Sequence, residues 1–451
     1  MVYSVWLRLD GEKARVIQNA IDKFAVDHRL ASFPAHVTVA TGLATIEDAL
    51  AAYSRIVNAK LLEIDPVPVA VLDRLEWSTV VVLRVKSHVT DVSLPYPPHV
   101  SLCYASDASP ADRVTWAAEL ASIVQLSGNV HAGDLEIWDT SHACSDEWFP
   151  VFPEKFADIA VNLTDEMFEG IYHEKRKHTD DRGDVISRSM AAGCDKLLVL
   201  GGSVEDSVIS IKLACGLDPS GRKILTTVGV HPTRAAEFGD VHLYDITRLA
   251  QDARVAALGE MGLDADRTHF CPMDLQVRAF RAQIDIAKNI ARLPLLLHFR
   301  GSDCFGAFVQ VLSEAPGLKG VVHSFTGTCD EMKVLTSMGL SIGINGCSLR
   351  DEAFLNHVLP YIPIDKLLLE TDSPYCDIRP THPSYKYLDK DSSPYLVVKP
   401  EKWVRGSLVK GRNEPCLIRQ VSQVVASIHP AGQGIIKAAY MNTLRLFPRF
   451  R

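Results

Sequence analysis

The chain has 451 residues, a length that accommodates two or three domains. Hydrophobic residues make up 47% and charged residues 23%, the proportions of an ordinary globular protein. The formal net charge of -8 argues against a broad electrostatic grip on nucleic acid, but it leaves room for an enzyme that neutralises nucleic acid locally with metal ions.

The cysteines and the first residues indicate the cellular setting. Ten cysteines are scattered without a C-x-x-C pair, which favours reduced thiols over a disulfide framework. The first run, Tyr3–Leu9, is strand-like and lacks the basic segment of a signal peptide, and no apolar run reaches the ~18 residues that span a bilayer. We therefore expect a cytoplasmic, alternatively nuclear, protein without a membrane partner. The sequence carries no indication of the oligomeric state.

Two copies of one short pattern occur within residues 1–152. A histidine and a hydroxyl lie two residues apart in each copy, His36-Val-Thr38 and His99-Val-Ser101, and proline residues precede both. On a strand such side chains share a face, opposite the intervening apolar residues. We expect both stretches to be strands. Helical spacing predicts a helix over 12–25, and further strands are expected at 3–9, 67–72, 79–85 and 134–139.

The paired histidines suit acid/base chemistry on a phosphate. Two imidazoles near neutral pKa can supply the base and the acid that open a cyclic phosphodiester without a metal, and the hydroxyls of Thr38 and Ser101 can donate hydrogen bonds to phosphoryl oxygens. One copy alone would more simply be an ordinary strand histidine, whereas two copies favour a function. Which histidine, His36 or His99, acts as the acid is left open.

Both motifs and the opening Tyr3-Ser-Val-Trp6 resemble the 2H phosphoesterases, specifically the plant and fungal cyclic phosphodiesterase branch. The resemblance covers about residues 2–152 and implies a bilobal α+β domain whose motifs line a central groove. It implies 2′,3′-cyclic phosphates or ADP-ribose 1″,2″-cyclic phosphate as the small partner, and no cofactor.

After residue 152 the pattern changes, so we expect one domain at 1–152 and a second at 153–451. Apolar runs alternate with amphipathic segments, which predicts an α/β fold, a (β/α)8 TIM barrel. The expected strands are 157–163, 196–201, 224–230, 255–259, 293–298, 320–323, 340–344 and 366–370. Expected helices include 184–192, 206–214, 273–291 and 331–338, and two C-terminal helices, 415–427 and 432–446, that cover the barrel.

The C-terminal ends of the expected strands carry polar residues. Doubly wound sheets share the strand–helix alternation, so these positions, where barrels carry their chemistry, are the stronger argument. A carboxylate at the end of a buried strand is costly without a partner, and two imidazoles with two carboxylates suit a divalent cation. The four predicted metal ligands are Glu260, His298, His323 and Asp372. The other polar residues at strand ends are Asn162, His231 and Asn345.

Seven short motifs are distributed through residues 157–451. They are Asn162-Leu-Thr-Asp165, Gly229-Val-His-Pro232, Gly259-Glu-Met-Gly-Leu-Asp264, Leu297-His-Phe-Arg300, His323-Ser-Phe-Thr-Gly327, Glu370-Thr-Asp-Ser-Pro374 and Arg412-Asn-Glu-Pro415. Together they closely resemble the TatD family of metal-dependent deoxyribonucleases, and the first motif is closest to the eukaryotic nuclear-type members.

This resemblance implies roles for the metal set. Glu260 would be a shared ligand, His298 and His323 would bind one cation, and Asp372 would bind another or orient the attacking water. Mg²⁺ or Mn²⁺ is the expected cofactor, and the imidazoles also accept Zn²⁺. Many relatives have His-x-His at the end of the first strand, where this chain has Ala160 and Asn162. Whether one or two ions bind is therefore open.

Other residues have weaker predictions. His231 is predicted to contact substrate, with a loop histidine packed by Pro232 as the alternative, and Arg300 is predicted to bind phosphate, with a structural ion pair as the alternative. We expect Asp264 to support a ligand, the Arg412–Pro415 motif to be structural, and His173 and His178 to be exposed to solvent in a helix-like polar stretch.

The favoured interpretation is a bifunctional phosphoesterase. The barrel would hydrolyse DNA with a divalent cation, as a 3′→5′ exonuclease, and the N-terminal domain would open small cyclic phosphates unaided. One alternative is a metal-dependent amide or ester hydrolase of small substrates. Another is that one half is a degenerate scaffold that binds nucleic acid, although the intact motifs in both halves argue against it.

Overall fold

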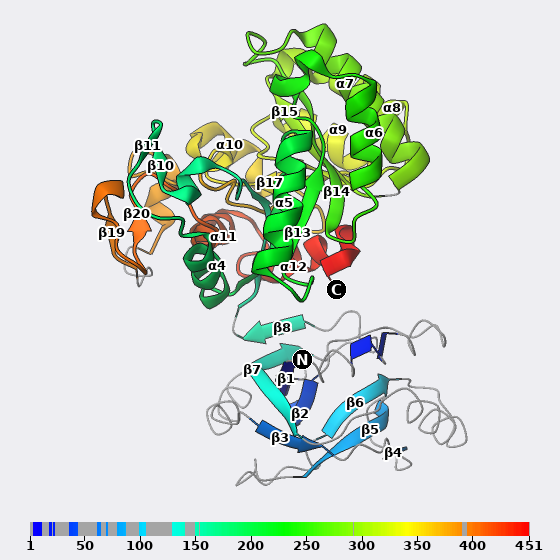
Figure 1. Cartoon of the computed structure of the whole chain (residues 1–451), viewed down its shortest axis with the longest axis vertical. Helices are drawn as coiled ribbons and strands as arrows, with labels where there is room; N and C mark the ends of the chain where they lie inside the picture. The colour runs from blue at the N-terminus through cyan, green and yellow to red at the C-terminus, as the bar shows by residue number, and fades with distance from the viewer. Residues whose placement is uncertain are drawn as a thin grey trace. The chain divides into compact units, whose positions relative to one another are not determined.

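The structure is a computed structural model of the whole chain (Figure 1). It describes residues 3–10, 18, 19, 21, 22, 36–43, 61–64, 69, 70, 79–86, 99–104, 129–139, 149–152, 154–291, 293–389 and 395–450. The chain divides into two compact units, Met1–Glu154 and Lys155–Arg451, and each is described by itself.

The first unit is built on antiparallel strands. Their bounds are β1 Tyr3–Asp10, β2 His36–Leu43, β3 Leu61–Ile64, β4 Val69–Ala70, β5 Thr79–Lys86, β6 His99–Tyr104, β7 Asn129–Asp139 and β8 Phe149–Phe152. Strands pair in the order β1-β2-β6-β5-β3-β7-β8, and β7 also pairs with β1, so six of them close into a ring. The predicted strands at 3–9, 79–85 and 134–139 are confirmed. Of the run 67–72, the described part is the two-residue strand β4.

The two histidine motifs begin neighbouring strands. His36 is the first residue of β2 and His99 the first of β6, so the expectation that both motifs are strands is confirmed. Within the predicted helix 12–25, residues 18, 19, 21 and 22 are helical, and the remainder lies outside the described residues. The bilobal arrangement stays a prediction.

The second unit is a barrel of eight parallel strands. They are β9 Phe156–Val161, β12 Cys194–Val199, β13 Ile224–Val228, β14 Val255–Asp264, β15 Leu295–Arg300, β16 Gly320–His323, β17 Ser341–Ile344 and β18 Leu367–Leu369. The strands pair in chain order, and a parallel bridge from Val161 to Ser373 joins the first strand to the segment after the last. Because the two edges of the sheet meet, the predicted TIM barrel is confirmed and a doubly wound sheet is excluded.

Helices surround the strands (Figure 1). They are α4 Arg182–Ala191, α5 Val204–Leu217, α6 Asp240–Leu249, α7 Met273–Ile286, α8 Phe305–Ser313, α9 Cys329–Ser337, α10 Glu352–His357, α11 Ile418–Ile428 and α12 Gly434–Leu446. The start of α9 is fixed by a capping box, in which Thr328 N–H donates to Glu331 and Glu331 N–H donates to the Thr328 hydroxyl. No helix in the described ranges is both long and apolar enough to cross a membrane.

The polar stretch around His178 differs from its prediction. It forms a hairpin of β10 (Ile171–Tyr172) and β11 (Lys175–Arg176), because His173 and Glu174 adopt positive φ angles that turn the chain. His178 is buried, stacks on Trp403 with ring centroids 5.0 Å apart, and its Nε2 lies 3.1 Å from the Tyr172 hydroxyl. The expectation of a helix is therefore wrong, and the expectation of exposure is wrong for His178 but confirmed for His173.

Alternation along the strands decides which residues enter the barrel. Leu296, Val321 and Leu368 belong to an inner apolar cluster, which Phe447 and Phe450 from the C-terminal segment complete. Side chains two residues further along each strand share this inward face. His298, His323 and Glu370 occupy those positions. The apolar layer therefore supports a polar layer at the C-terminal ends of the strands.

Asp158 links the first strand to the loop after the last. Its carboxylate is buried and accepts hydrogen bonds from Thr371 N–H at 2.9 Å and from the Thr371 hydroxyl at 2.5 Å. Burial is the main influence on this carboxyl, and it raises the pKa of Asp158 to about 8 despite these hydrogen bonds.

An Asp158→Asn substitution is therefore expected to change the pH dependence of stability. A folded-state pKa above the unfolded value means that the native state binds the extra proton between pH 4 and 8, so wild-type stability falls as pH rises through this window. The Asp158→Asn variant has no carboxyl group to titrate at this position. Its melting temperature, expressed as a difference from that of wild type, should therefore rise from pH 5 to pH 8. Thermal unfolding at several pH values measures this difference, with Asp252→Asn as an exposed control. If the melting temperatures of Asp158→Asn and wild type change in parallel with pH, the raised pKa of Asp158 is contradicted.

Candidate metal centre and active site

Strand β14 brings Glu260 close to the histidines because two glycines flank this residue. Gly259 directly precedes Glu260, and Gly262 lies two positions after it. Gly259 and Gly262 have φ angles of +141° and +149°. A Cβ at Gly259 would lie 2.1 Å from the carbonyl oxygen of Leu296, and one at Gly262 would lie 1.9 Å from that of His298. Only glycine permits this close approach of β14 to β15.

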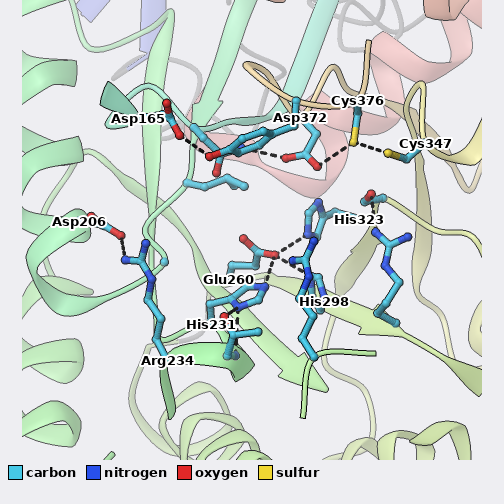
Figure 2. A pocket seen from close by; sticks show the side chains of 18 of the residues that line it. Asp165, Asp206, His231, Arg234, Glu260, His298, His323, Cys347, Asp372 and Cys376 are labelled. Carbon is cyan, nitrogen blue, oxygen red and sulfur yellow. Dashed lines mark hydrogen bonds and ion pairs between the residues drawn. The ribbon is translucent and has the colours of Figure 1, made fainter. Parts of the chain in front are cut away.

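One carboxylate oxygen lies at the centre of the site. Glu260 Oε1 is 2.8 Å from His298 Nδ1, 2.7 Å from His323 Nε2 and 3.3 Å from His231 Nε2 (Figure 2). The side chains of Glu260, His298 and His323 are all at least 92% buried. The structure therefore brings together three of the four predicted metal ligands and adds His231 to them.

Two acidic residues lie next to the imidazoles, and an amide side chain holds one of them. His298 Nε2 lies 3.2 Å from Asp264 Oδ2, and His323 Nδ1 lies 3.5 Å from Glu370 Oε1. The same Glu370 oxygen accepts hydrogen bonds from Asn345 Nδ2 at 2.8 Å and from the Ser324 N–H at 2.7 Å. A carboxylate that hydrogen-bonds a histidine, as Asp264 does, fixes ring orientation at metal sites, whereas Glu370 is at ion-pair distance from His323 Nδ1, which has no hydrogen-bond partner among the described residues. Asp264 has the supporting position predicted for it, whereas no role was predicted for Glu370.

The electrostatics of the cluster favour an ionised carboxylate. Burial alone would raise the pKa of Glu260, but His323 and His231 outweigh it and hold that pKa well below its usual range. Burial likewise acts to lower the pKa of His323, but Glu260 and Glu370 raise it well above the ordinary value. For His231, burial and the neighbouring imidazoles lower the pKa despite Glu260. The cluster therefore concentrates negative charge that attracts a proton or a cation.

His231 has a defined tautomer. The backbone N–H of Thr233 donates to His231 Nδ1 at 3.1 Å, so the proton of the neutral ring lies on Nε2, which faces Glu260. The lowered pKa keeps the ring neutral. His231 is thus fixed against the cluster by its position at the start of the 3-10 turn Pro232–Glu237 and is not a free loop residue.

The donor set fits a divalent cation. Ligand atoms of Glu260, His298 and His323 all lie within 4.8 Å of one another, and so do those of a second group, His231, Asp264 and His298. Asp264 Oδ1 is buried without a hydrogen-bond partner among the described residues, which is a costly state unless a ligand satisfies it. Mixed nitrogen and oxygen donors are compatible with Mn²⁺, Mg²⁺ or Zn²⁺.

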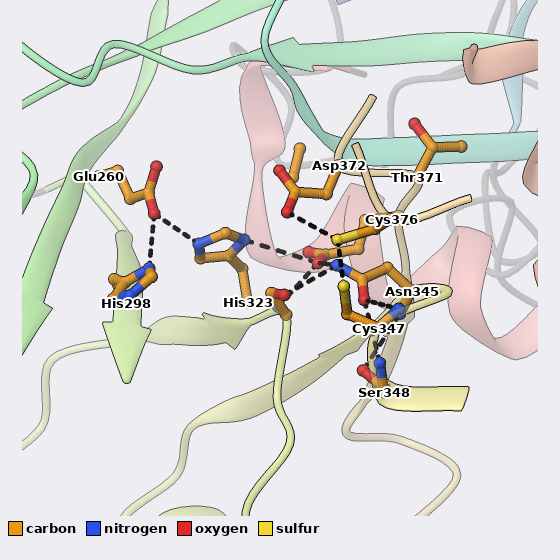
Figure 3. Close-up of polar contacts among 12 residues, drawn as sticks. Glu260, His298, His323, Asn345, Cys347, Ser348, Thr371, Asp372 and Cys376 are labelled. Atoms are coloured by element: carbon orange, nitrogen blue, oxygen red, sulfur yellow. Dashed lines mark hydrogen bonds and ion pairs between the residues drawn. The ribbon is translucent and has the colours of Figure 1, made fainter. Parts of the chain in front are cut away.

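Asp372 lines the same pocket but belongs to neither donor group. Its Oδ1 accepts a hydrogen bond from Asn162 Nδ2 at 2.9 Å, so Asn162 positions this carboxylate. Asp372 Oδ2 lies 3.4 Å from Cys376 Sγ, which is 2.7 Å from Cys347 Sγ (Figure 3). Burial raises the pKa of Asp372 to about 6, with His323 acting against it. The prediction that Asp372 joins the other three ligands directly stays a prediction.

Around this centre lies a pocket of about 790 Å³, within the range of ligand sites. Its lining includes four arginines: Arg234, Arg267, Arg300 and Arg350. Arg300 donates to the hydroxyls of Ser324 at 3.2 Å and Thr326 at 3.1 Å, and among the described residues it does not form the ion pair considered as its alternative. Carboxylates line the pocket as well, and one of them, Asp206, pairs with Arg234, so the lining around the carboxylate–histidine cluster carries both signs of charge.

The Arg412–Pro415 motif has structural contacts, as predicted. Arg412 donates to both oxygens of Asp181, at 2.7 Å each, and to Glu414 at 2.7 Å, and Arg188 donates to Glu414 at 2.8 and 3.1 Å. All four side chains are buried. Asn413 Nδ2 donates to the carbonyl oxygens of Thr371 and Tyr375. The motif thus holds the loop that carries Asp372.

The histidine motifs of the first unit are described by their backbone. Strands β2 and β6 are antiparallel neighbours, with Thr38 opposite His99 and Val37 opposite Val100. Residues directly opposite each other, and residues two apart on one strand, share a face of the sheet. His36, Thr38, His99 and Ser101 therefore lie on one face, and their side chains are outside the described part of the structure.

Comparison with known proteins identifies the family to which the second unit is similar. The model of the TatD-related DNase family matches residues 157–448 and does not extend into the first unit. The chain is 41% identical over 286 residues to deoxyribonuclease Tat-D of Schizosaccharomyces pombe, covering 61% of this chain and 89% of that protein. It is 36% identical to a 3'-5' ssDNA/RNA exonuclease TatD of Erwinia billingiae, covering 60% and 90%.

A solved structure agrees with the sequence comparisons. The TatD family hydrolase of Entamoeba histolytica superimposes with a TM-score of 0.61 at 33% identity, covering 65% of this chain and 98% of that one. Family model, sequence relatives and fold therefore coincide on the barrel. From residue 157 to residue 448, this chain belongs to the family of TatD-related DNases.

Proposed function

We propose that the barrel is a divalent-metal-dependent nuclease that removes nucleotides from the 3′ end of single-stranded DNA. The observation that carries this proposal is the buried Glu260–His298–His323 cluster in a pocket whose polar lining includes Arg300. Membership of the TatD-related DNase family and the activities named for the relatives support a nucleic-acid phosphodiester as the substrate.

In this mechanism Glu260, His298 and His323 would hold the cation, with His231 and Asp264 beside them. A bound divalent cation lowers the pKa of its water and neutralises charge on phosphoryl oxygens. Asp372 is fixed at Oδ1 by Asn162, and a pKa near 6 leaves it ionised at neutral pH yet basic enough to accept a proton at Oδ2. Arg300, held by two hydroxyls, binds a phosphate oxygen, and His231 contacts the substrate beside it.

Removal of the divalent cation with EDTA distinguishes this function from its alternatives. With Mn²⁺ or Mg²⁺ the full chain should shorten a 5′-labelled single strand progressively, and EDTA should abolish the reaction because the nucleophile depends on the cation. A phosphorothioate cap at the 3′ end should block degradation, and a 5′ cap should not. EDTA-resistant cleavage would refute the metal dependence. Cleavage of small amides or esters that single-stranded DNA does not inhibit would favour the small-substrate hydrolase.

A second activity is proposed for the first unit, the metal-independent opening of small cyclic phosphates by His36 and His99. The supporting observation is the register that places both histidines and both hydroxyls on one face of paired strands. Two imidazoles on one face can supply a base on one side of the phosphate and an acid on the other.

Single-histidine variants test this second activity. Hydrolysis of a 2′,3′-cyclic nucleotide in EDTA should fall by about 10²- to 10⁴-fold in His36→Ala and in His99→Ala, because each removes one acid/base group. His131→Ala, in strand β7 outside both motifs, should retain it, and the nuclease should be unaffected. No hydrolysis by the wild type, with or without EDTA, would favour a scaffold role for this unit. Hydrolysis that EDTA abolishes, or that both variants retain, would contradict the assignment of metal-independent chemistry to these histidines.

The cysteines accord with a reducing compartment. The eight cysteines of the described part of the second unit are free thiols. A cytosolic or nuclear location is accordingly part of the proposal.

A further inference from the structure

Tyr375 is an aromatic side chain held rigidly in the wall of the pocket. Its backbone N–H donates to the carbonyl oxygen of Asp372 at 3.0 Å, and its own carbonyl oxygen accepts from Asn413 Nδ2 at 2.8 Å. Its phenolic hydroxyl donates to Asp165 Oδ2, and the Asp165 Oδ1 atom accepts from the Met167 N–H at 2.9 Å. Both the backbone and the tip of this side chain are therefore fixed, three residues after Asp372.

The ring is nevertheless open to the pocket. Tyr375 is 48% exposed and lines the same pocket as Glu260 and Asp372. Within the described part of the chain, no aromatic ring or cation stacks on it. Because Asp165 already binds the hydroxyl, the surface left for a ligand is the face of the ring. A rigid aromatic face binds planar groups with a small entropic cost.

The surroundings indicate which planar group fits. Figure 2 shows Asp165 and Asp372 on one side of the pocket and Glu260, His231 and His298 on the other. The same pocket has arginines among its acidic lining residues, and Arg300 is held there by two hydroxyls, so a ligand that carries a phosphate and a flat ring can contact a guanidinium and the face of Tyr375. Every nucleobase has such a face, and it is free only where the base is unpaired.

We propose that Tyr375 is a substrate-positioning residue that stacks on an unpaired nucleobase next to the phosphodiester to be cleaved. This inference rests on the proposed nuclease function and narrows its substrate to strands with an unpaired terminal base. Stacking tolerates all bases, so the site requires a base without selecting its identity. Paired duplex ends and abasic ends are poor substrates for the same reason.

Abasic substitutions measure the requirement for a base. Single strands carrying one abasic residue at the last, second or third position from the 3′ end are compared with the unmodified strand, using the full chain and Mn²⁺. At one position the wild type should lose about 5- to 100-fold in kcat/KM. For Tyr375→Ala, kcat/KM on the unmodified strand should fall by a similar factor. The abasic residue should then cause no further decrease in kcat/KM. Tyr375→Phe should retain the penalty, and Tyr361→Ala, an exposed tyrosine outside the pocket, should behave as wild type.

Fluorescence separates this inference from the nuclease function itself. A strand with 2-aminopurine at the sensitive position, bound in EDTA so that it is not degraded, should be quenched by wild type and Tyr375→Phe but not by Tyr375→Ala. If the wild type degrades single strands yet shows no abasic penalty, or if Tyr375→Ala retains penalty and quenching, the stacking role is refuted and the nuclease stands. If the wild type neither binds nor degrades single strands, the proposed nuclease fails and the stacking role fails with it.

Discussion

Glu260→Gln is expected to lower the rate of single-strand DNA hydrolysis by about 10³-fold or more. A catalytic cation supplies several kcal/mol of transition-state stabilisation, and each 1.4 kcal/mol changes the rate about tenfold. Glutamine preserves the size of the side chain but removes the charge that three imidazoles surround at 2.7–3.3 Å. The loss should appear in kcat measured at saturating DNA and in the affinity for Mn²⁺ measured by calorimetry.

Glu401→Gln provides the matched control. This glutamate is exposed and lies outside the pocket, so the same change of charge should leave both hydrolysis and Mn²⁺ binding unaltered. Circular dichroism verifies that both variants are folded. Retention of more than about a tenth of the wild-type rate by folded Glu260→Gln would exclude Glu260 as an essential ligand.

Arg412→Leu is expected to lower the free energy of unfolding by about 3–5 kcal/mol. Removing Arg412 leaves two buried carboxylates, Asp181 and Glu414, to share the single cation of Arg188, and an excess of buried negative charge is costly. Asp181 would lose two hydrogen bonds of 2.7 Å and Glu414 would lose one. Burial acts to lower the pKa of Arg412, but Asp181 and Glu414 raise it, so the guanidinium is charged in the native state. Urea and thermal unfolding of the barrel measure the loss.

Arg405→Leu is the comparison for this network. Arg405 pairs with Asp184 at 3.2 Å but is 85% exposed, and pairs of this kind contribute about 0–1 kcal/mol. A similar small cost for Arg412→Leu would show that the buried network contributes little. The substitution should also reduce activity, since the adjacent Asn413 holds the loop that carries Asp372 and Tyr375.

Much of the barrel follows from patterns in the sequence. The eight strands were predicted because each is a short apolar run bounded by polar or glycine residues, and parallel barrel strands are buried on both faces. The position of His298 and His323 also follows, since alternation fixes them two residues above Leu296 and Val321 on the inward face. Glu260 was identifiable because it is a lone carboxylate inside such a run.

Contacts that depend on loop conformation were less predictable. Asp372 and Cys376 have φ angles of 54° and 56°, which side-chain-bearing residues adopt only when surrounding contacts impose them. The contact of Asp372 with Asn162 and the approach of Cys347 to Cys376 depend on this backbone path. The position of Glu370 was less predictable for another reason. It belongs to the motif Glu370–Pro374, which obscures that it is the inward-facing residue two positions after Leu368.

Anomalous diffraction from crystals of the full chain soaked in Mn²⁺ tests the cation site most directly. We expect a peak at coordination distance from the ligand atoms of Glu260, His298 and His323, and its loss in Glu260→Gln. A protein that degrades single-stranded DNA with Mn²⁺ but shows no peak there, or a peak elsewhere alone, would contradict the assignment of the catalytic centre to this cluster.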